Sequence, residues 1–297
     1  MGRDRRGSGP DHRLFPAPDV RNTIVCELFA LSAEKPVNIR YDLKRFAAEG
    51  GERHRNRDGW GIALVEGADA HLFREAAPAS DSALDRFLSD NVPPHATMIA
   101  HVRRASSGTR SLENTHPFRR VQAGRVHHFA HNGTLIGLEV FPEAESLTRE
   151  AVGQTDSEIA FLILLGRLAR DAPDQQDTAG RFEVFVTFCA DMRELGPANF
   201  LWLDGDVVHV HPDRRHFETR NGLTDAQPPG LHMLRPDAGH SYGRHALVGA
   251  EIDALPENAV IFASLPLSDH RWEPLARGTV LSISAGRINY RSPMRSD

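Results

Sequence analysis

The order of helical and strand-like segments constrains the fold of this chain more than any other feature. Apolar residues recur at helical spacing after Thr155 and again between Phe182 and Leu195, which predicts two neighbouring helices. Short apolar segments of strand-like composition lie on both sides of this pair. Strands, then helices, then strands again are typical of an α+β domain in which two sheets pack face to face and helices cover their outer surfaces.

Shorter patterns predict the remaining elements. Residues 155–158, Thr-Asp-Ser-Glu, have the spacing of a capping box at the start of the first helix. Small residues at 67–69 predict a hairpin turn, and we expect the Gly-, Pro- and His-rich residues 220–243 to form an irregular surface segment. The predicted strands cover residues 25–31, 59–65, 71–73, 97–102, 126–130, 200–203, 207–210, 260–264, 280–283 and 288–290, and further helices are predicted at 38–49 and 82–88.

Composition argues against several classes of protein. The chain has 297 residues, 40% of them hydrophobic, which is enough for a substantial core. Its formal net charge of −5 argues against a general nucleic-acid binder. No segment approaches the roughly 18 apolar residues of a membrane helix, and the N-terminus lacks the apolar core of a secretory signal. Two cysteines, Cys26 and Cys189, are too few for a disulfide framework, so we expect reduced thiols and a cytoplasmic location.

The first 25 residues differ from the rest of the chain. They are rich in Arg, Asp, Gly and Pro and show no sustained apolar periodicity, so they cannot easily offset the entropy lost on ordering. We therefore expect residues 1–25 to be a disordered leader. Beyond them the sequence shows no internal repeat and no second boundary, which predicts a single domain over residues 26–297.

Four segments carry side chains suited to catalysis. Cys26 opens an apolar strand, and a thiol attacks an amide carbonyl best as a thiolate or beside a base. Arg103 ends the segment Ala-His-Val-Arg, and its guanidinium fork suits a carboxylate. Asn132 and Gly133 can donate hydrogen bonds to an oxyanion, and Asp156 can pair with an ammonium group. Together these segments indicate an amidohydrolase.

Each of these residues also has a purely structural interpretation. Cys26 alone fits an inert core thiol, because free cysteine is often buried. Arg103 fits a surface cation, the Asn132-Gly133 pair a simple turn, and Asp156 a partner of a helix N-terminus. The combination of all four segments in one chain favours the catalytic interpretation. Cys189 lies in an apolar helical segment without comparable neighbours, so we expect it to pack in the core.

The ordered set of motifs resembles the class II glutamine amidotransferases, a branch of the N-terminal-nucleophile hydrolases. The motifs are Cys-Glu-Leu at 26–28, Asp-Gly-Trp-Gly-Ile at 58–62, Ile-Ala-His-Val-Arg at 99–103, Glu-Asn-Thr-His-Pro-Phe at 113–118, Ala-His-Asn-Gly at 130–133 and Thr-Asp-Ser-Glu at 155–158. The chain looks most like the small stand-alone bacterial members and the amidotransferase-type subunit of a glutathione-degrading complex. The resemblance implies a four-layer αββα sandwich of two mainly antiparallel sheets flanked by helices.

The resemblance also implies a reaction and a role for each site residue. The reaction is hydrolysis of the γ-amide of glutamine or of a γ-glutamyl compound through a thioester on Cys26, with release of glutamate and ammonia or an amine. Asn132 and Gly133 would stabilise the oxyanion. Arg103, rather than its neighbour Arg104, would hold the substrate α-carboxylate, and Asp156 its α-ammonium group. No metal or organic cofactor is implied, and the family leaves room for an ammonia-accepting or peptidase partner protein.

The position of the thiol conflicts with the chemistry of such families, in which the base is the α-amine of the nucleophile itself. A free α-amine titrates at about 7.7–8.0, whereas an amide nitrogen is not basic in that range. Residues 1–25 would therefore have to be cleaved after Val25, or the start site is placed too far upstream. We expect the second, since the chain is rich in Arg with only Lys35 and Lys44, a bias of GC-rich genes, and a GTG-type valine codon can initiate translation.

Two other functions remain open at this point. One is a catalytically inactive subunit that binds glutamine or a γ-glutamyl compound for regulation, with the leader still attached. The other is a metallohydrolase, suggested by His127, His128 and His131. On a strand His127 and His131 share a face while His128 points away, and no carboxylate-bearing metal motif accompanies them, so we expect no metal.

Overall fold

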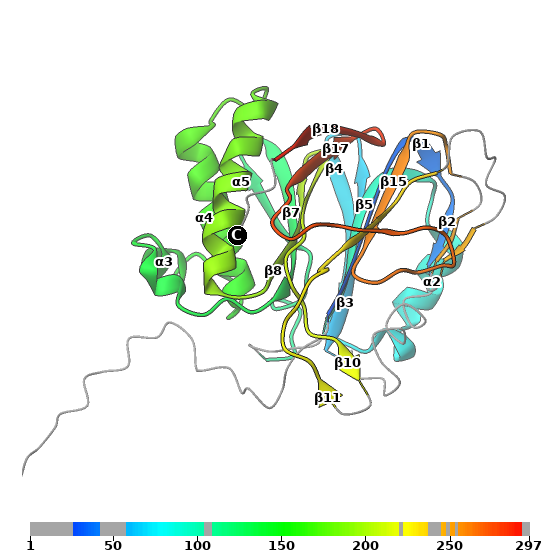
Figure 1. The fold of residues 1–297 in the computed structure, drawn as a ribbon, viewed down its shortest axis with the longest axis horizontal. Helices are drawn as coiled ribbons and strands as arrows, with labels where there is room; N and C mark the ends of the chain where they lie inside the picture. Colours follow the sequence, from blue (N-terminus) through cyan, green and yellow to red (C-terminus); the bar gives the residue numbers. More distant parts are fainter. Residues whose placement is uncertain are drawn as a thin grey trace, which may run out of the picture.

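Two antiparallel sheets lie face to face at the centre of the computed structural model (Figure 1). The structure describes residues 26–41, 58–103, 109–219, 222–236, 245–247, 250–252 and 255–292. Every strand pairing among the described residues is antiparallel. The seven-stranded sheet has the order β16 (Glu273–Pro274), β12 (His232–Leu234), β15 (Ala259–Ala263), β1 (Glu27–Val37), β5 (His95–Arg103), β3 (Gly59–Glu66) and β4 (Asp69–Glu75). The six-stranded sheet has the order β18 (Arg287–Arg291), β17 (Leu281–Ser284), β9 (Val207–His211), β8 (Ala198–Asp204), β7 (Arg125–Gly133) and β6 (Phe118–Gln122).

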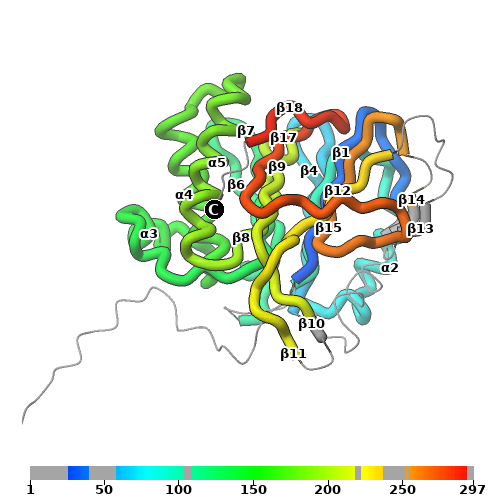
Figure 2. Tube along the Cα trace, in the orientation of Figure 1, coloured from blue at the N-terminus to red at the C-terminus, as the bar shows by residue number. Residues whose placement is uncertain are grey.

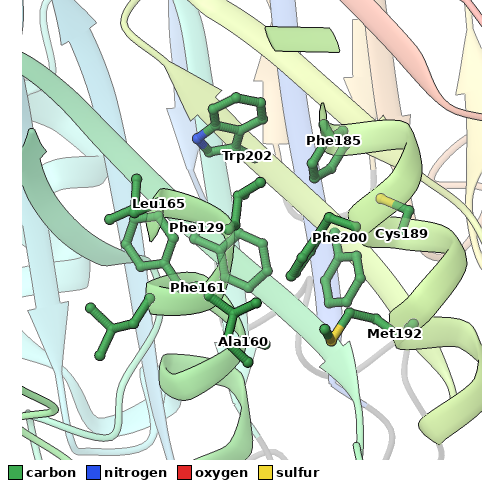
Figure 3. Packing of buried hydrophobic residues seen from close by; sticks show 14 of the residues in the cluster. Phe129, Ala160, Phe161, Leu165, Phe185, Cys189, Met192, Phe200 and Trp202 are labelled. Atoms are coloured by element: carbon green, nitrogen blue, oxygen red, sulfur yellow. The ribbon is translucent and has the colours of Figure 1, made fainter. Parts of the chain in front are cut away.

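Helices cover the outer face of the six-stranded sheet. The long pair α4 (Asp156–Asp171) and α5 (Thr178–Leu195) runs along this face, with the short elements η2 (Leu138–Val140) and α3 (Ala144–Leu147) at one end (Figures 1 and 2). Phe161 of α4 stacks on Phe129 of β7 with ring centroids 5.1 Å apart, and Phe188 of α5 lies 5.4 Å from Phe200 of β8. Figure 3 shows Phe129, Phe161 and Phe200 between the helices and the sheet, and Phe188 belongs to the same buried cluster. Burial of such a side chain contributes roughly 1.5–3 kcal/mol.

The outer face of the seven-stranded sheet carries a mixed layer. Its described elements are η1 (Ala79–Asp81), the helix α2 (Ala83–Asn91) and a small sheet of β13 (His245–Leu247), β14 (Ala250–Ile252) and β2 (Ile39–Tyr41). Leu88 of α2 and Ile39 of β2 belong to the same buried cluster as Trp60 of β3. Four layers are therefore present, and a small sheet shares the fourth with a helix. A separate hairpin joins β10 (Glu218–Thr219) to β11 (Gly222–Leu223).

Side-chain alternation along the strands separates three apolar layers. On β1, Leu28 and Ala30 face the space between the two sheets, where they meet Leu201 of β8. Phe29 and Leu31 of the same strand face the outer mixed layer. Because both faces of β1 are buried, its apolar residues run nearly without interruption, which explains why the sequence shows an apolar run rather than an alternating pattern.

Most predicted elements are confirmed, including the hairpin of β3 and β4 and both long helices. Three expectations need correction. Residues 39–41 form a strand, not the start of a helix over 38–49, and 42–49 lie outside the described residues. The segment 220–243 was expected to be an irregular surface segment, but it contributes β12, which pairs with β15 inside the main sheet. In the predicted capping box only Thr155 acts as expected, because the Glu158 carboxylate accepts from the amides of 152 and 153 instead.

The leader predicted at residues 1–25 lies outside the described residues. Among the helices of the described chain, none combines the length and the apolar character needed to cross a membrane.

Candidate functional site

Cys26 stands immediately before β1, at one edge of the contact between the two sheets. Its side chain is buried, with 6% of its surface exposed. Glu27 pairs with Val102 of β5, so one further step along both strands brings Cys26 opposite Arg103. Strand alternation puts Cys26 on the same side as Leu28, which faces the six-stranded sheet. The thiol residue therefore lies where the second sheet can supply its neighbours.

Asn132 is one such neighbour, near the end of β7. Its side-chain Nδ2 donates to the main-chain carbonyl of Cys26 at 2.5 Å, although the two residues are 106 positions apart. Ala130, two positions earlier on the same face, packs between the sheets. The structure thus brings two of the predicted site residues together across the sheet interface.

Gly133 follows at the last position of β7, opposite Ala198 of β8. A β-carbon at this position would lie 1.7 Å from the main-chain oxygen of Pro197. No other residue fits there without movement of the backbone. The close approach explains the need for glycine beside Asn132.

Arg103 is the last residue of β5 and is nearly fully buried. Its Nη1 lies 3.5 Å from the main-chain oxygens of Asp58 and Thr109. Burial lowers the pKa of the guanidinium, and the negative charges of Cys26, Asp58 and Asp156 oppose that shift. The charge of Arg103 is therefore within electrostatic reach of both predicted anionic site residues. Arg104 lies outside the described residues.

Asp156 is the first residue of α4 and is also buried. The helix is capped by Thr155, whose hydroxyl accepts from the amide of Glu158 at 3.2 Å. Because Thr155 caps the helix, the Asp156 carboxylate can bond elsewhere. Its Oδ2 accepts from the amide of Leu135 at 2.7 Å. That bond ties the start of α4 to the turn that follows Gly133.

Buried neutral histidines line the same region. His131 lies beside Asn132, and its Nε2 donates to the oxygen of Pro197 at 3.1 Å while Nδ1 faces the Ser157 hydroxyl at 2.9 Å. Burial, followed by the charge of Arg103, lowers the pKa of His101 to about 3. The ring of His116 contacts that of His101 with centroids 4.4 Å apart, and burial holds its pKa well below the usual range. These three histidines therefore add no positive charge to the site at neutral pH.

The metal alternative gains no support from the positions of its histidines. His127 lies beside Asp204, at the opposite end of β7 from His131. Among the described residues, no three His, Cys, Asp or Glu side chains come together as a candidate metal site. Cys189 packs among the aromatic residues under α5, as predicted, and burial raises its pKa well above the usual value. A raised pKa disfavours the reactive thiolate at this second cysteine.

Three residues that the sequence did not single out also belong to this region. Asn199 is fully buried on β8, opposite Asn132. Asp213 and Arg215 follow β9, and Arg215 forms a buried two-pronged ion pair with Glu27, the neighbour of Cys26. No local pattern marks these side chains, because their partners are distant in the sequence.

The chain belongs to the class II glutamine amidotransferases, and its fold agrees with that family. The family model "Glutamine amidotransferases class-II" matches residues 25–296. The resemblance inferred from the motifs is thereby confirmed, and so is the predicted fold class. Membership supports a general reaction at the amide of glutamine, by hydrolysis or by transfer of its nitrogen.

Individual relatives give the same picture. The Escherichia coli protein named "Putative glutamine amidotransferase YafJ" is 34% identical over 198 residues, which are 66% of this chain and 76% of the relative. A crystal structure described as a predicted glutamine amidotransferase from Pseudomonas aeruginosa superposes with a TM-score of 0.64 at 26% identity, covering 89% of this chain and 100% of that one. The glutamine phosphoribosylpyrophosphate amidotransferase of B. subtilis, 16% identical with a TM-score of 0.56 over 90% of this chain and 49% of its own, shares the fold.

Proposed function

We propose that this protein hydrolyses the γ-amide of glutamine or of a γ-glutamyl compound with Cys26 as nucleophile. The observation that carries the proposal is the hydrogen bond from Asn132 to the carbonyl of Cys26, which joins the predicted oxyanion residue to the predicted nucleophile across two sheets. The charge interaction between Cys26 and Arg103 adds support, because the site then holds a cation suited to the substrate α-carboxylate.

In the proposed reaction, the Cys26 thiolate attacks the γ-carbonyl carbon and forms a carbon–sulfur bond. Asn132 Nδ2 and the Gly133 amide donate to the oxygen that becomes negative. The carbon–nitrogen bond then breaks, and the leaving amine takes a proton from the α-ammonium group of Cys26. Water, deprotonated by the regenerated α-amine, attacks the thioester and releases glutamate and the free thiol. The residues in this scheme need no metal or organic cofactor.

Arg103 and Asp156 are proposed to hold the glutamyl head. The guanidinium fork of Arg103 would bind the substrate α-carboxylate, and the carboxylate of Asp156 its α-ammonium group. The Leu135 amide already donates to one oxygen of Asp156 and fixes the orientation of this carboxylate. An oriented acceptor loses less freedom on binding than a mobile one.

The scheme requires Cys26 to be the first residue of the mature protein, because the α-amine acts as the base. We propose that translation starts at Val25 and that the initiator methionine is then removed. Intact mass of protein purified from its natural host decides this point, and an active species that still carries residues 1–25 would contradict it. We further propose that residues 26–297 act as a single domain in the cytoplasm, alone or with an ammonia-accepting or peptidase partner.

A panel of γ-glutamyl amides tests the function directly. Glutamine, glutathione and simple γ-glutamyl amines are incubated with the wild-type protein, Cys26→Ala and the control Cys189→Ala, and glutamate and the released amine are quantified. We expect turnover by wild type and Cys189→Ala and none by Cys26→Ala. Retained ligand binding without turnover in the trimmed wild-type protein would instead identify a regulatory binding subunit.

A further inference from the structure

Asn199 uses its whole side-chain amide to hold three main-chain atoms that belong to two separate segments. Its Nδ2 donates to the oxygen of Asn132 at 2.9 Å and to the oxygen of Arg214 at 2.9 Å, while its Oδ1 accepts from the amide of Asp213 at 2.8 Å. The residue is fully buried. Both hydrogens and the oxygen of the amide are therefore occupied by backbone partners, a pattern suited to fixing positions.

Residues near Asp213 also bond to Ala198, which precedes Asn199 on β8. The Ala198 amide donates to the carboxylate of Asp213 at 3.1 Å, and His211 Nδ1 donates to the Ala198 oxygen at 2.6 Å. Ala198 and Asn199 are the residues opposite Gly133 and Asn132. Residues 211–214 thus hold the part of β8 that pairs with the two proposed oxyanion donors on β7.

The same segment reaches the strand of the nucleophile in the other sheet. Arg215 donates to both carboxylate oxygens of Glu27 at 2.8 and 3.1 Å, and both side chains are buried. Glu27 is bonded directly to Cys26 in the chain. Apolar packing between the sheets is non-directional, whereas these bonds have fixed geometry. They define where the end of β7 stands relative to the start of β1.

We infer that Asn199 is a positioning residue for the hydrolysis proposed above, acting through the backbone of Asn132. It does not touch the reacting atoms. Its two donors hold Asn132 against residues 213–215, and these residues are anchored to the strand of the thiol by Arg215. Displacement of catalytic groups by about 1 Å costs on the order of 10²-fold in rate. The inference rests on the proposed function and names a further residue on which the rate depends.

The variant Asn199→Asp tests this role with little change in size. It keeps the acceptor for the Asp213 amide but replaces both donors with a carboxylate oxygen facing two carbonyls. We expect kcat for glutamine or the best γ-glutamyl amide to fall about 10- to 100-fold, with KM within about threefold of wild type. The rate of Cys26 alkylation by iodoacetamide is expected to stay within about twofold of wild type, because alkylation does not use the oxyanion donors.

Gly230→Ala provides a second, independent perturbation. A β-carbon at Gly230 would lie 1.7 Å from Oδ1 of Asn199, so the substitution must displace that side chain without altering any proposed site residue. The matched control is Gly166→Ala in α4, where a β-carbon meets nothing within 4 Å. We expect Gly230→Ala to lower kcat in the same way and Gly166→Ala to leave it unchanged. Should Asn199→Asp fail to fold, Gly230→Ala decides the question.

The outcomes separate this inference from the function on which it rests. Absence of Cys26-dependent turnover in the wild type would overturn the proposed function and the inference with it. An active wild type together with a folded Asn199→Asp of normal kcat would overturn the inference alone. A fall in kcat matched by an equal fall in the alkylation rate would also overturn it, because it would indicate general damage to the site.

Discussion

The side-chain amide of Asn132 holds the main-chain carbonyl of Cys26, so a residue of one sheet fixes the backbone that carries the thiol of the other. Strand pairing alone cannot set this distance, because the two residues belong to different sheets. The contact explains why a thiol at a strand end has a defined position relative to residues about a hundred positions away. It also makes Asn132 the most direct point at which to perturb the site.

Removal of this amide is expected to reduce turnover strongly. Asn132→Ala should lower kcat about 10²- to 10³-fold, because one oxyanion donor is lost. Loss of the bond to Cys26 adds a modest stability cost of about 1 kcal/mol. Steady-state kinetics and urea unfolding measure the two effects. The exposed Asn289→Ala serves as control, and near-normal kcat in a folded Asn132→Ala would exclude the proposed role.

Gly133→Ala is expected to destabilise the protein by about 1–3 kcal/mol, since the added carbon would lie 1.7 Å from the Pro197 oxygen and the backbone must shift. Gly166→Ala is the matched control, because the same added carbon meets open space there. The difference between the two variants in urea unfolding measures the effect. Equal stability of both variants would show that the end of β7 moves easily away from Pro197, the residue before β8.

Arg103→Lys is expected to weaken substrate binding rather than to stop the chemistry. A lysine keeps the charge but loses the two-pronged grip on a carboxylate, so KM should rise about tenfold with a smaller effect on kcat. Arg119→Lys is the control, because Arg119 pairs with Asp69 on the surface. A KM for Arg103→Lys equal to that of the control would argue against contact with the substrate α-carboxylate.

Buried histidines predict that acid destabilises the fold. Burial lowers the pKa of His101 and His209 to about 3 and that of His127, His128 and His211 to about 4. These rings are neutral in the folded protein, whereas in the unfolded chain they bind protons below about pH 6.5. The unfolded state therefore holds more protons below about pH 6.5. The free energy of unfolding should fall as the pH drops from about 6.5 towards 4, by up to roughly 1.4 kcal/mol per pH unit for each histidine.

Urea unfolding at pH 7.0 and 5.0 measures this dependence. His211→Asn offers a specific check, because an asparagine amide can replace the donor to the Ala198 oxygen but does not titrate. The pH dependence of its stability should be weaker by about one proton. Equal stability of the wild type at both pH values would show that the histidines are protonated inside the fold.

Local patterns predicted the elements whose stabilising contacts are themselves local. The apolar spacing of α4 and its cap at Thr155 are readable because helix contacts join residues three or four positions apart. Strand β12 was missed because its three residues follow two prolines and a glycine, and its burial comes from β15, far along the chain. Residues 39–41 were assigned to a helix for a similar reason, since only pairing with β14 makes them a strand.

The site divides in the same way. Cys26, Arg103, Asn132 and Asp156 stand in short motifs, so their types and order suffice to propose them. Asn199 and Arg215 make their decisive bonds to residues 67 and 188 positions away, and nothing in their immediate sequence distinguishes them from other polar residues at strand ends. The residues proposed to carry the chemistry could therefore be named from the sequence, whereas those proposed to fix their geometry required the fold.

The packing layers can be followed separately by fluorescence, since the three tryptophans of the chain are unevenly distributed. Trp60 and Trp272 belong to the buried cluster between the seven-stranded sheet and its outer layer, whereas Trp202 lies under the long helices and stacks on His209 with centroids 4.3 Å apart. A protein that retains Trp202 alone would report on the helical side, and one that retains Trp60 alone on the opposite side. Coincident emission changes on heating would demonstrate that the sandwich melts as one cooperative unit.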